Sequence, residues 1–300
     1  MESQTPLHHP GAIFQLPGGT PREIVVKAKE LCISNDIQRF RELLDSAPSE
    51  AEHFTITDFG VVMCQAVEQD RVPFIQALLD RGFPLDPCYA RIATRHQSKK
   101  TLALWMENGW DINAPMCGTE PSVLGIAVND ESMAVWLLDN GADPNKRTFM
   151  DVTPLSWAVE WGSISVIKAM LDRTTDIHAG QVLHHAARRA SDTIQVLEML
   201  IEKGAPLNTP MYQDSNTVSM QCFMSLGTPL HTAAELGNLD VVRLLLSKGA
   251  DPTVKDYQGK TVIELARRMN RLEVVEVLEK DKKKEKQKEE KEKEGEEKGE

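Results

Sequence analysis

The sequence contains no apolar run that approaches the roughly 18 residues needed by a membrane-spanning helix. Its first 22 residues hold no basic start followed by an apolar stretch, so they lack the features of a secretory signal. We therefore expect no membrane partner. We expect an intracellular protein, located in the cytoplasm or, as the alternative, in the nucleus.

Cysteine is scarce and shows no pairing pattern. The five cysteines are an odd number, they are spread along the chain, and no two of them form a Cys-x-x-Cys pair. This usage is typical of reduced thiols inside a cell. It argues against a disulfide framework and against a zinc site.

Motifs for catalysis and for cofactor binding are also missing. Gly259-Lys260-Thr261 copies only the end of a phosphate-binding loop, because Val254 stands where the first glycine of that loop is needed. His184 and His185 are adjacent, so they cannot chelate one metal from a single helix face. We predict a protein that is not an enzyme, with no metal, no cofactor and no small-molecule substrate.

An excess of basic charge is absent as well. The formal net charge of the chain is −11. Such a surface is repelled by phosphate backbones, so nucleic acid is not an expected partner. The same charge favours a basic surface on a partner protein.

The sequence does contain an internal repeat. Thr228, Ala233 and Val241 recur 33 residues later as Thr261, Ala266 and Val274. Helix-ending signals also recur along the chain, at Gly82, Gly109, Gly141, Gly204 and Gly249, with Thr174 in the same slot. One helix pair buries too little apolar area to offset its ordering entropy, so a period of this size predicts a stack of helix pairs.

The repeat has a recognisable opening, Thr228-Pro229-Leu230-His231, and a recognisable ending, Gly249-Ala250-Asp251-Pro252. With these motifs the chain resembles an ankyrin-repeat protein over about residues 23–280. Thr153-Pro154-Leu155 and Leu183-His184 match the opening in part. The resemblance implies an all-α solenoid of about eight stacked helix-turn-helix units, with short turns and no conventional sheet. It also implies that the repeats bind other proteins and lack catalysis.

The repeat register predicts three regions. Residues 1–22 are expected to be a disordered arm, residues 23–280 the repeat domain, and residues 281–300 a charged Lys/Glu tail that is either disordered or an extension of the last helix. The eight units cover about 23–47, 58–86, 88–113, 121–145, 153–178, 181–208, 228–253 and 261–280. An insertion at 211–226 falls between the sixth and seventh units.

The resemblance implies that partners bind at two kinds of position, the concave face of the first helices and the turn tips. These positions are Arg95, His96, Glu160, Trp161, Arg188, Arg189, Glu235 and Leu236 on first helices, and Phe149 and Met150 in a turn. Trp161 stands out, since an exposed tryptophan is a common binding anchor. The alternative is that Trp161 packs against Trp157 or the adjacent helix. Phe149 and Met150 have a similar alternative, which is to cover the core beneath them.

These features favour a non-catalytic scaffold or adaptor that binds another protein and is monomeric alone. An alternative within the binding class is a recognition or inhibitory subunit of a larger enzyme complex. An alternative from a different class is an enzyme with a site near the 211–226 insertion, using Cys222 and His231.

Overall fold

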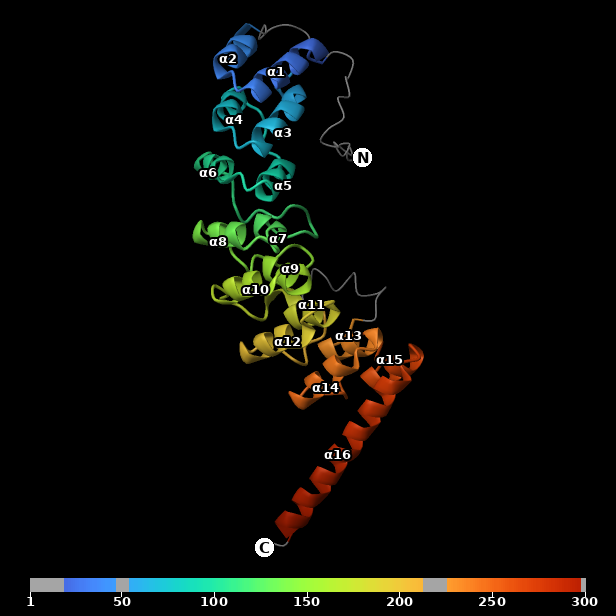
Figure 1. The fold of residues 1–300 in the computed structure, drawn as a ribbon. Helices are drawn as coiled ribbons and strands as arrows, with labels where there is room; N and C mark the ends of the chain where they lie inside the picture. Colours follow the sequence, from blue (N-terminus) through green and yellow to red (C-terminus); the bar gives the residue numbers. More distant parts are fainter. Residues whose placement is uncertain (1–18, 47–53, 213–225, 298–300) are drawn as a thin grey trace. The chain divides into compact units, whose positions relative to one another are not determined.

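The structure is a computed structural model that describes residues 19–46, 54–212 and 226–297 (Figure 1). These residues form sixteen α-helices and two short 3-10 helices. Within the described ranges there is no strand, only an isolated antiparallel bridge between Lys255 and Thr261. The predicted all-α fold class is confirmed.

The chain divides into two compact parts, residues 1–116 and 117–300. The helices of the N-terminal part are α1 (Arg22–Ser34), α2 (Ile37–Ser46), α3 (Gly60–Glu68), α4 (Val72–Leu79), α5 (Pro87–Arg95) and α6 (Lys99–Glu107). The first helix of each pair contacts the first helix of the next, so α1, α3 and α5 form one layer. The second helices α2, α4 and α6 form the other layer.

The C-terminal part follows the same plan over five helix pairs. Its helices are α7 (Val123–Ile126), α8 (Glu131–Asp139), α9 (Pro154–Trp161), α10 (Ile164–Leu171), α11 (Val182–Arg188), α12 (Thr193–Glu202), α13 (Pro229–Leu236), α14 (Leu239–Ser247), α15 (Val262–Arg268) and α16 (Leu272–Glu297). The first helices α7, α9, α11, α13 and α15 contact one another in that order. On the second-helix side, α8 contacts α10, and α14 contacts both α12 and α16.

Short polar side chains at the helix starts explain why these short segments are helical. Thr153, Thr228 and Thr261 each begin a first helix with a reciprocal capping box, in which the third helical residue bonds back to the threonine. Such caps satisfy backbone donors that a helix start leaves unpaired. The helices end in a matching way: Gly249 has φ of +92°, a left-handed conformation that glycine adopts without steric cost.

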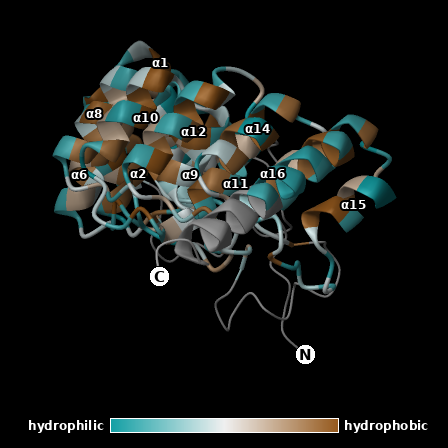
Figure 2. Ribbon diagram, turned by 90° about the horizontal axis from the view of Figure 1, so that it is seen from below, coloured by the Kyte–Doolittle hydropathy of each residue, from teal (hydrophilic) through white to brown (hydrophobic). Residues whose placement is uncertain are grey.

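Apolar side chains between the two helix layers form the core. In the N-terminal part, Phe40 and Phe74 are fully buried with ring centroids 5.0 Å apart. In the C-terminal part, Leu155 and Leu230 occupy equivalent positions of two first helices and are fully buried. Figure 2 shows the result, since individual helices carry both hydrophobic and hydrophilic residues. Each pair is therefore stabilised by apolar area that its neighbours cover.

Neighbouring pairs are also joined by a recurring hydrogen bond, which we call the helix-end bond. A group that follows one first helix donates to a carbonyl near the end of the preceding first helix. The bonds are Arg71 to Cys32 O, Ser98 Oγ to Val67 O (2.6 Å), Ser163 N to Val128 O (3.0 Å), Arg189 to Val159 O (3.0 Å) and Arg271 Nε to Glu235 O (2.9 Å). These bonds satisfy carbonyls that a helix end leaves without an intrahelical partner.

The flanks differ in part from the expected arm and tail. The expected disordered arm was 1–22. In the structure α1 begins at Arg22, and Thr20 is 2% exposed, with its backbone N–H donating to Asp58 Oδ2 at 2.7 Å. The arm's residues 1–18 lie outside the described residues. At the other end, α16 continues through the Lys/Glu tail to Glu297, which is the helical alternative for that segment.

The two ends of the predicted insertion lie beside each other. Met211 N and His184 Nε2 both donate to Gly227 O, at 3.1 and 3.0 Å. Met211 and Leu226 are both buried. We call this arrangement the Gly227 clasp. Residues 213–225 of the insertion, including Cys222, lie outside the described residues.

Candidate functional site

The predicted binding positions of the C-terminal part fall at the ends of successive first helices. Trp161 ends α9, Leu236 ends α13 and Met269 follows α15, each in the same repeat position. Arg189 holds that position after α11. Because α9, α11, α13 and α15 contact one another in sequence, these helix ends form a row. We call it the first-helix row.

Three members of the row expose apolar side chains to solvent. Trp161 is 64% exposed, Leu236 49% and Met269 38%. Trp161 therefore presents most of its side chain to solvent. An exposed tryptophan carries a large apolar area with no partner, and such side chains are favoured anchors in protein interfaces.

Arg189 corrects the sequence-based expectation that both arginines after α11 face a partner. It is 9% exposed, and its guanidinium donates to Val159 O at 3.0 Å and to Ser191 O at 2.6 Å. The side chain thus makes a helix-end bond instead of reaching solvent. Its role in the described structure is to tie α11 to α9.

Glu160 is also engaged within the protein. Its carboxylate lies 2.5 Å from His185 Nδ1 of α11, and its side chain is only 13% exposed. The sequence placed Glu160 on the binding face but did not identify His185 as its partner. In the sequence, the pair could have been indicated only by a glutamate followed by a histidine one repeat later. That spacing is too common to be specific.

Arg188 is exposed and differs from Arg189 in its surroundings. Its guanidinium contacts the sulfur of Met211 at 3.7 Å, a neutral group in the Gly227 clasp. Glu235, at the equivalent position of α13, is half-buried. Two residues were predicted on each helix. The exposed one is Arg188 on α11 and Leu236 on α13.

The remaining predicted positions are not members of the row. Phe149, in the turn before α9, is 58% exposed, whereas Met150 beside it is half-buried. Arg95 ends α5 and His96 follows it, both exposed, but they belong to the N-terminal part. The first-helix row is thus formed by the C-terminal part alone.

The histidines of the repeat openings are structural. His231 Nδ1 accepts from Thr228 N at 3.2 Å and its Nε2 donates to Lys260 O at 3.2 Å. Burial lowers the pKa of His231, and it lowers the pKa of the fully buried His184 to about 3. Both ring nitrogens of His231 are therefore engaged by backbone groups of the described fold.

The described ranges also bear on metal binding and on membrane insertion. Those residues contain no cluster of three or more histidine, cysteine or acidic side chains placed to hold a metal ion. None of the helices formed by these residues combines the length and apolarity that crossing a membrane requires.

Comparison with known proteins agrees with the repeat pattern. A family model of ankyrin repeats, in three copies, matches residues 122–211 and 183–289, which together exceed half of the chain. A putative ankyrin repeat protein of fowlpox virus is 23% identical over 188 residues, covering 56% of this chain and 27% of the viral protein. Human transient receptor potential cation channel subfamily A member 1 is 30% identical over 173 residues, covering 46% of this chain and 16% of the channel.

A shorter match is more identical. A probable E3 ubiquitin-protein ligase of rice, XBOS33, is 50% identical over 56 residues, which are 19% of this chain and 11% of the ligase. The chain thus spans between 11% and 27% of the length of these three relatives. The likeness concerns the repeats, whose general role in the family is non-catalytic protein binding. On the family model, the repeat motifs and the helical stack together, the chain belongs to the ankyrin-repeat family.

Proposed function

We propose that the chain is a protein-binding scaffold or adaptor, and that the first-helix row of the C-terminal part is its binding surface. The observation that carries the proposal is Trp161, which is 64% exposed at the end of α9. Leu236 and Met269 are exposed at the equivalent positions of α13 and α15. Exposed apolar side chains repeated along adjoining helices have a cost in water, which a bound partner removes.

The geometry also favours binding over folding as the reason for these side chains. The first helices also carry small, fully buried residues, such as Ala158, Ala233 and Ala266, which allow adjoining helices to pack closely. The helix-end bonds of Arg189 and Arg271 then hold the ends of neighbouring first helices together. A surface on packed helices is preorganised, so little entropy is lost there when a partner binds.

The test compares Trp161→Ala with Ile194→Ala in the full chain, using affinity capture from cell extract followed by mass spectrometry. Ile194 is also an exposed apolar residue, but it lies on the second helix α12. Truncating a central tryptophan anchor costs about 2 kcal/mol or more, which is about thirtyfold in affinity. We expect a partner that wild type and Ile194→Ala retain and Trp161→Ala loses, with unchanged circular dichroism. Partners retained equally by all three proteins would contradict the proposal.

A second candidate function is a recognition subunit of an enzyme complex. It is favoured by three relatives that are named as E3 ubiquitin-protein ligases or as probable or putative members of that class. If this candidate holds, material captured with wild-type chain will transfer ubiquitin in the presence of activating and conjugating enzymes. Capture of a partner without such activity would leave the scaffold function in place and remove this one.

A further inference from the structure

The charges around the first-helix row differ from the charge of the whole chain. Three exposed arginines lie at or next to the ends of these first helices: Arg188 ends α11, Arg268 ends α15, and Arg271 follows α15. The chain as a whole carries a net charge of −11. The general expectation of a basic partner therefore does not follow for this surface.

Each of these arginines is bonded to a neutral group. Arg188 contacts the sulfur of Met211 at 3.7 Å, Arg268 donates to the amide oxygen of Gln258 at 2.9 Å, and Arg271 donates to Glu235 O at 2.9 Å. Elsewhere on the helix stack, arginines form ion pairs, as Arg173 does with Asp139 at 2.7 Å and Arg267 with Glu279 at 2.8 Å. The cationic charge of the row is thus left available to an anion.

Three acidic side chains near the row are bonded, paired or partly buried. Glu160 is 13% exposed and bonded to His185, and Asp192 lies 3.9 Å from the buried Arg189. Glu235 is half-buried at the end of α13. A guanidinium binds a carboxylate through paired, charge-assisted hydrogen bonds, so a ligand that supplies carboxylates gains most at Arg188 and Arg268.

We propose that the first-helix row binds an acidic polypeptide segment that carries apolar anchor residues. This inference rests on the proposed function and names the partner's chemistry. Apolar side chains of the segment cover Trp161 and Leu236, and its carboxylates meet Arg188 and Arg268. Apolar and cationic side chains alternate along the row, in the order Trp161, Arg188, Leu236 and then Arg268 beside Met269. The segment must therefore carry apolar and acidic groups in the same alternation.

Helix packing sets the length of that segment. Adjacent packed helices lie about 8–10 Å apart, so Trp161 and Leu236, two helices apart, are separated by about 20 Å. An extended chain covers this span in about six residues and an α-helix in about 13. A segment of about 16 residues therefore reaches both anchors in either conformation.

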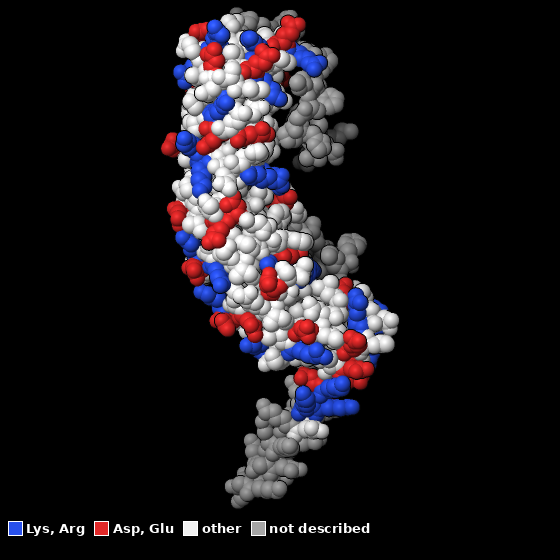
Figure 3. Space-filling model, viewed as in Figure 1, with Lys and Arg blue, Asp and Glu red and all other residues white. Residues whose placement is uncertain are grey.

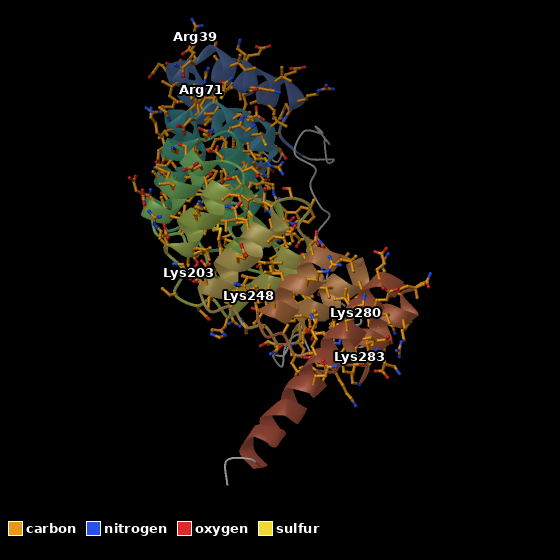
Figure 4. The ribbon with its side chains drawn as sticks, turned by 60° about the horizontal axis from the view of Figure 1, so that its bottom comes forward. Arg39, Arg71, Lys203, Lys248, Lys280 and Lys283 are labelled. Carbon is orange, nitrogen blue, oxygen red and sulfur yellow. The ribbon has the colours of Figure 1, made fainter. Side chains whose placement is uncertain are left out.

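The test uses a phage-displayed library of random 16-residue peptides selected on the immobilised full chain. Selected peptides are then measured by fluorescence anisotropy against wild type, Arg188→Glu/Arg268→Glu, Trp161→Ala, and a matched control, Lys203→Glu/Lys248→Glu. Lys203 and Lys248 are also exposed cations, but they follow the second helices α12 and α14, as Figure 4 shows. The control therefore makes the same change in net charge away from the row.

We expect acidic peptides with leucine, phenylalanine or similar anchors. Their affinity should fall roughly tenfold or more on charge reversal of the arginines, and fall again as salt is raised. The lysine control should bind within about twofold of wild type. Trp161→Ala should also bind weakly.

Three outcomes separate the two proposals. Selected peptides that are neutral or basic, yet depend on Trp161, would overturn the acidic-segment inference and leave the proposed function standing. Acidic peptides that lose affinity equally in the lysine control would show binding to general positive charge, which also overturns the inference. Peptides that bind independently of Trp161 and of both arginines would remove the first-helix row itself.

Discussion

At the scale of single residues, the repeat opening shows how one side chain serves two repeats. His231 accepts from the backbone at the start of its own helix and donates to Lys260 O of the following repeat. His184 does the second task at Gly227 O. Burial favours the neutral form of both histidines, because it lowers the pKa of each.

The buried His184 makes stability depend on pH. Burial, the largest cause, lowers its pKa from 6.5 to about 3 in the folded chain. Below about pH 6.5 the unfolded chain binds a proton there and the folded chain does not, so the free energy of unfolding decreases as the pH falls from 6.5 towards 3. Urea unfolding at a series of pH values should show up to about 1.4 kcal/mol of lost stability per pH unit from this group.

The matched variants for this prediction are His184→Gln and His178→Gln. His178 is exposed, so His178→Gln makes the same substitution outside a buried site. His184→Gln should reduce the slope by about one proton, while the remaining slope includes His231. Equal slopes for wild type and His184→Gln would contradict the burial argument.

Gly227 is a second residue whose identity is set by its surroundings. A β-carbon there would lie 2.3 Å from Cγ of His231, well inside contact distance. We expect Gly227→Ala to lower the free energy of unfolding by about 1–3 kcal/mol, because the histidine ring must move from its bonded position. Gly118→Ala, where a β-carbon meets nothing within 4 Å, should stay within about 0.5 kcal/mol of wild type. Thermal unfolding of both variants decides the matter.

At the scale of helices, the helix-end bonds explain why the positions after a first helix fall into two classes. Arg189 is buried and reaches back to the preceding helix, whereas Arg188 and Trp161 are exposed. Neighbouring residues of the same type therefore differ in their surroundings. The difference is set by which carbonyl lies within reach.

Arg188→Met and Arg189→Met separate these two classes. Arg189→Met leaves Val159 O without its donor in a buried site, so the free energy of unfolding should fall by about 1–3 kcal/mol. Arg188→Met should change stability by less than about 0.5 kcal/mol but weaken partner binding. Chemical unfolding and the binding assay, run on the same preparations, should give opposite rankings. The same ranking in both assays would mean that the two arginines share one role.

At the scale of the molecule, the apolar core and the charged tail occupy separate parts of the chain. Figure 3 shows charges of both signs intermixed over the visible face of the described stack. Residues 281–300 contain no apolar residue. In α16 the buried residues Val274, Val275 and Leu278 all precede that segment. The core of the last repeat is therefore complete before the tail begins.

Removal of residues 281–300 should consequently leave the free energy of unfolding within about 0.5 kcal/mol of the full chain. The helical signal in circular dichroism should decrease, since α16 continues to Glu297. A chain ending at residue 271 is the contrasting variant, because it also removes Val274 and Leu278 and exposes α15. Comparable losses of stability in the two truncations would show that the tail contributes to the core.

The sequence predicted features that depend on patterns within one repeat. It could not predict which atom of a neighbouring repeat a long side chain contacts. Capping threonines, helix-ending glycines and apolar periodicity act within one repeat, and the all-α stack follows from them. The exposure of Trp161 was one of two alternatives. The burial of Arg189 depends on a carbonyl one repeat earlier, and the pairing of Glu160 with His185 on a side chain one repeat later. Long side chains have several partners within reach, and only three-dimensional packing selects one.

The Gly227 clasp has a consequence for insertions in this sequence. Because the Met211 N–H donates to Gly227 O, the two ends of the insertion are held together by a contact that does not involve the residues between them. Doubling the length of such a loop costs only about 0.6 kcal/mol. The clasp is thus a position at which new sequence can be inserted beside the first-helix row. Protein engineers could graft a second recognition element or a reporter there without rebuilding the scaffold.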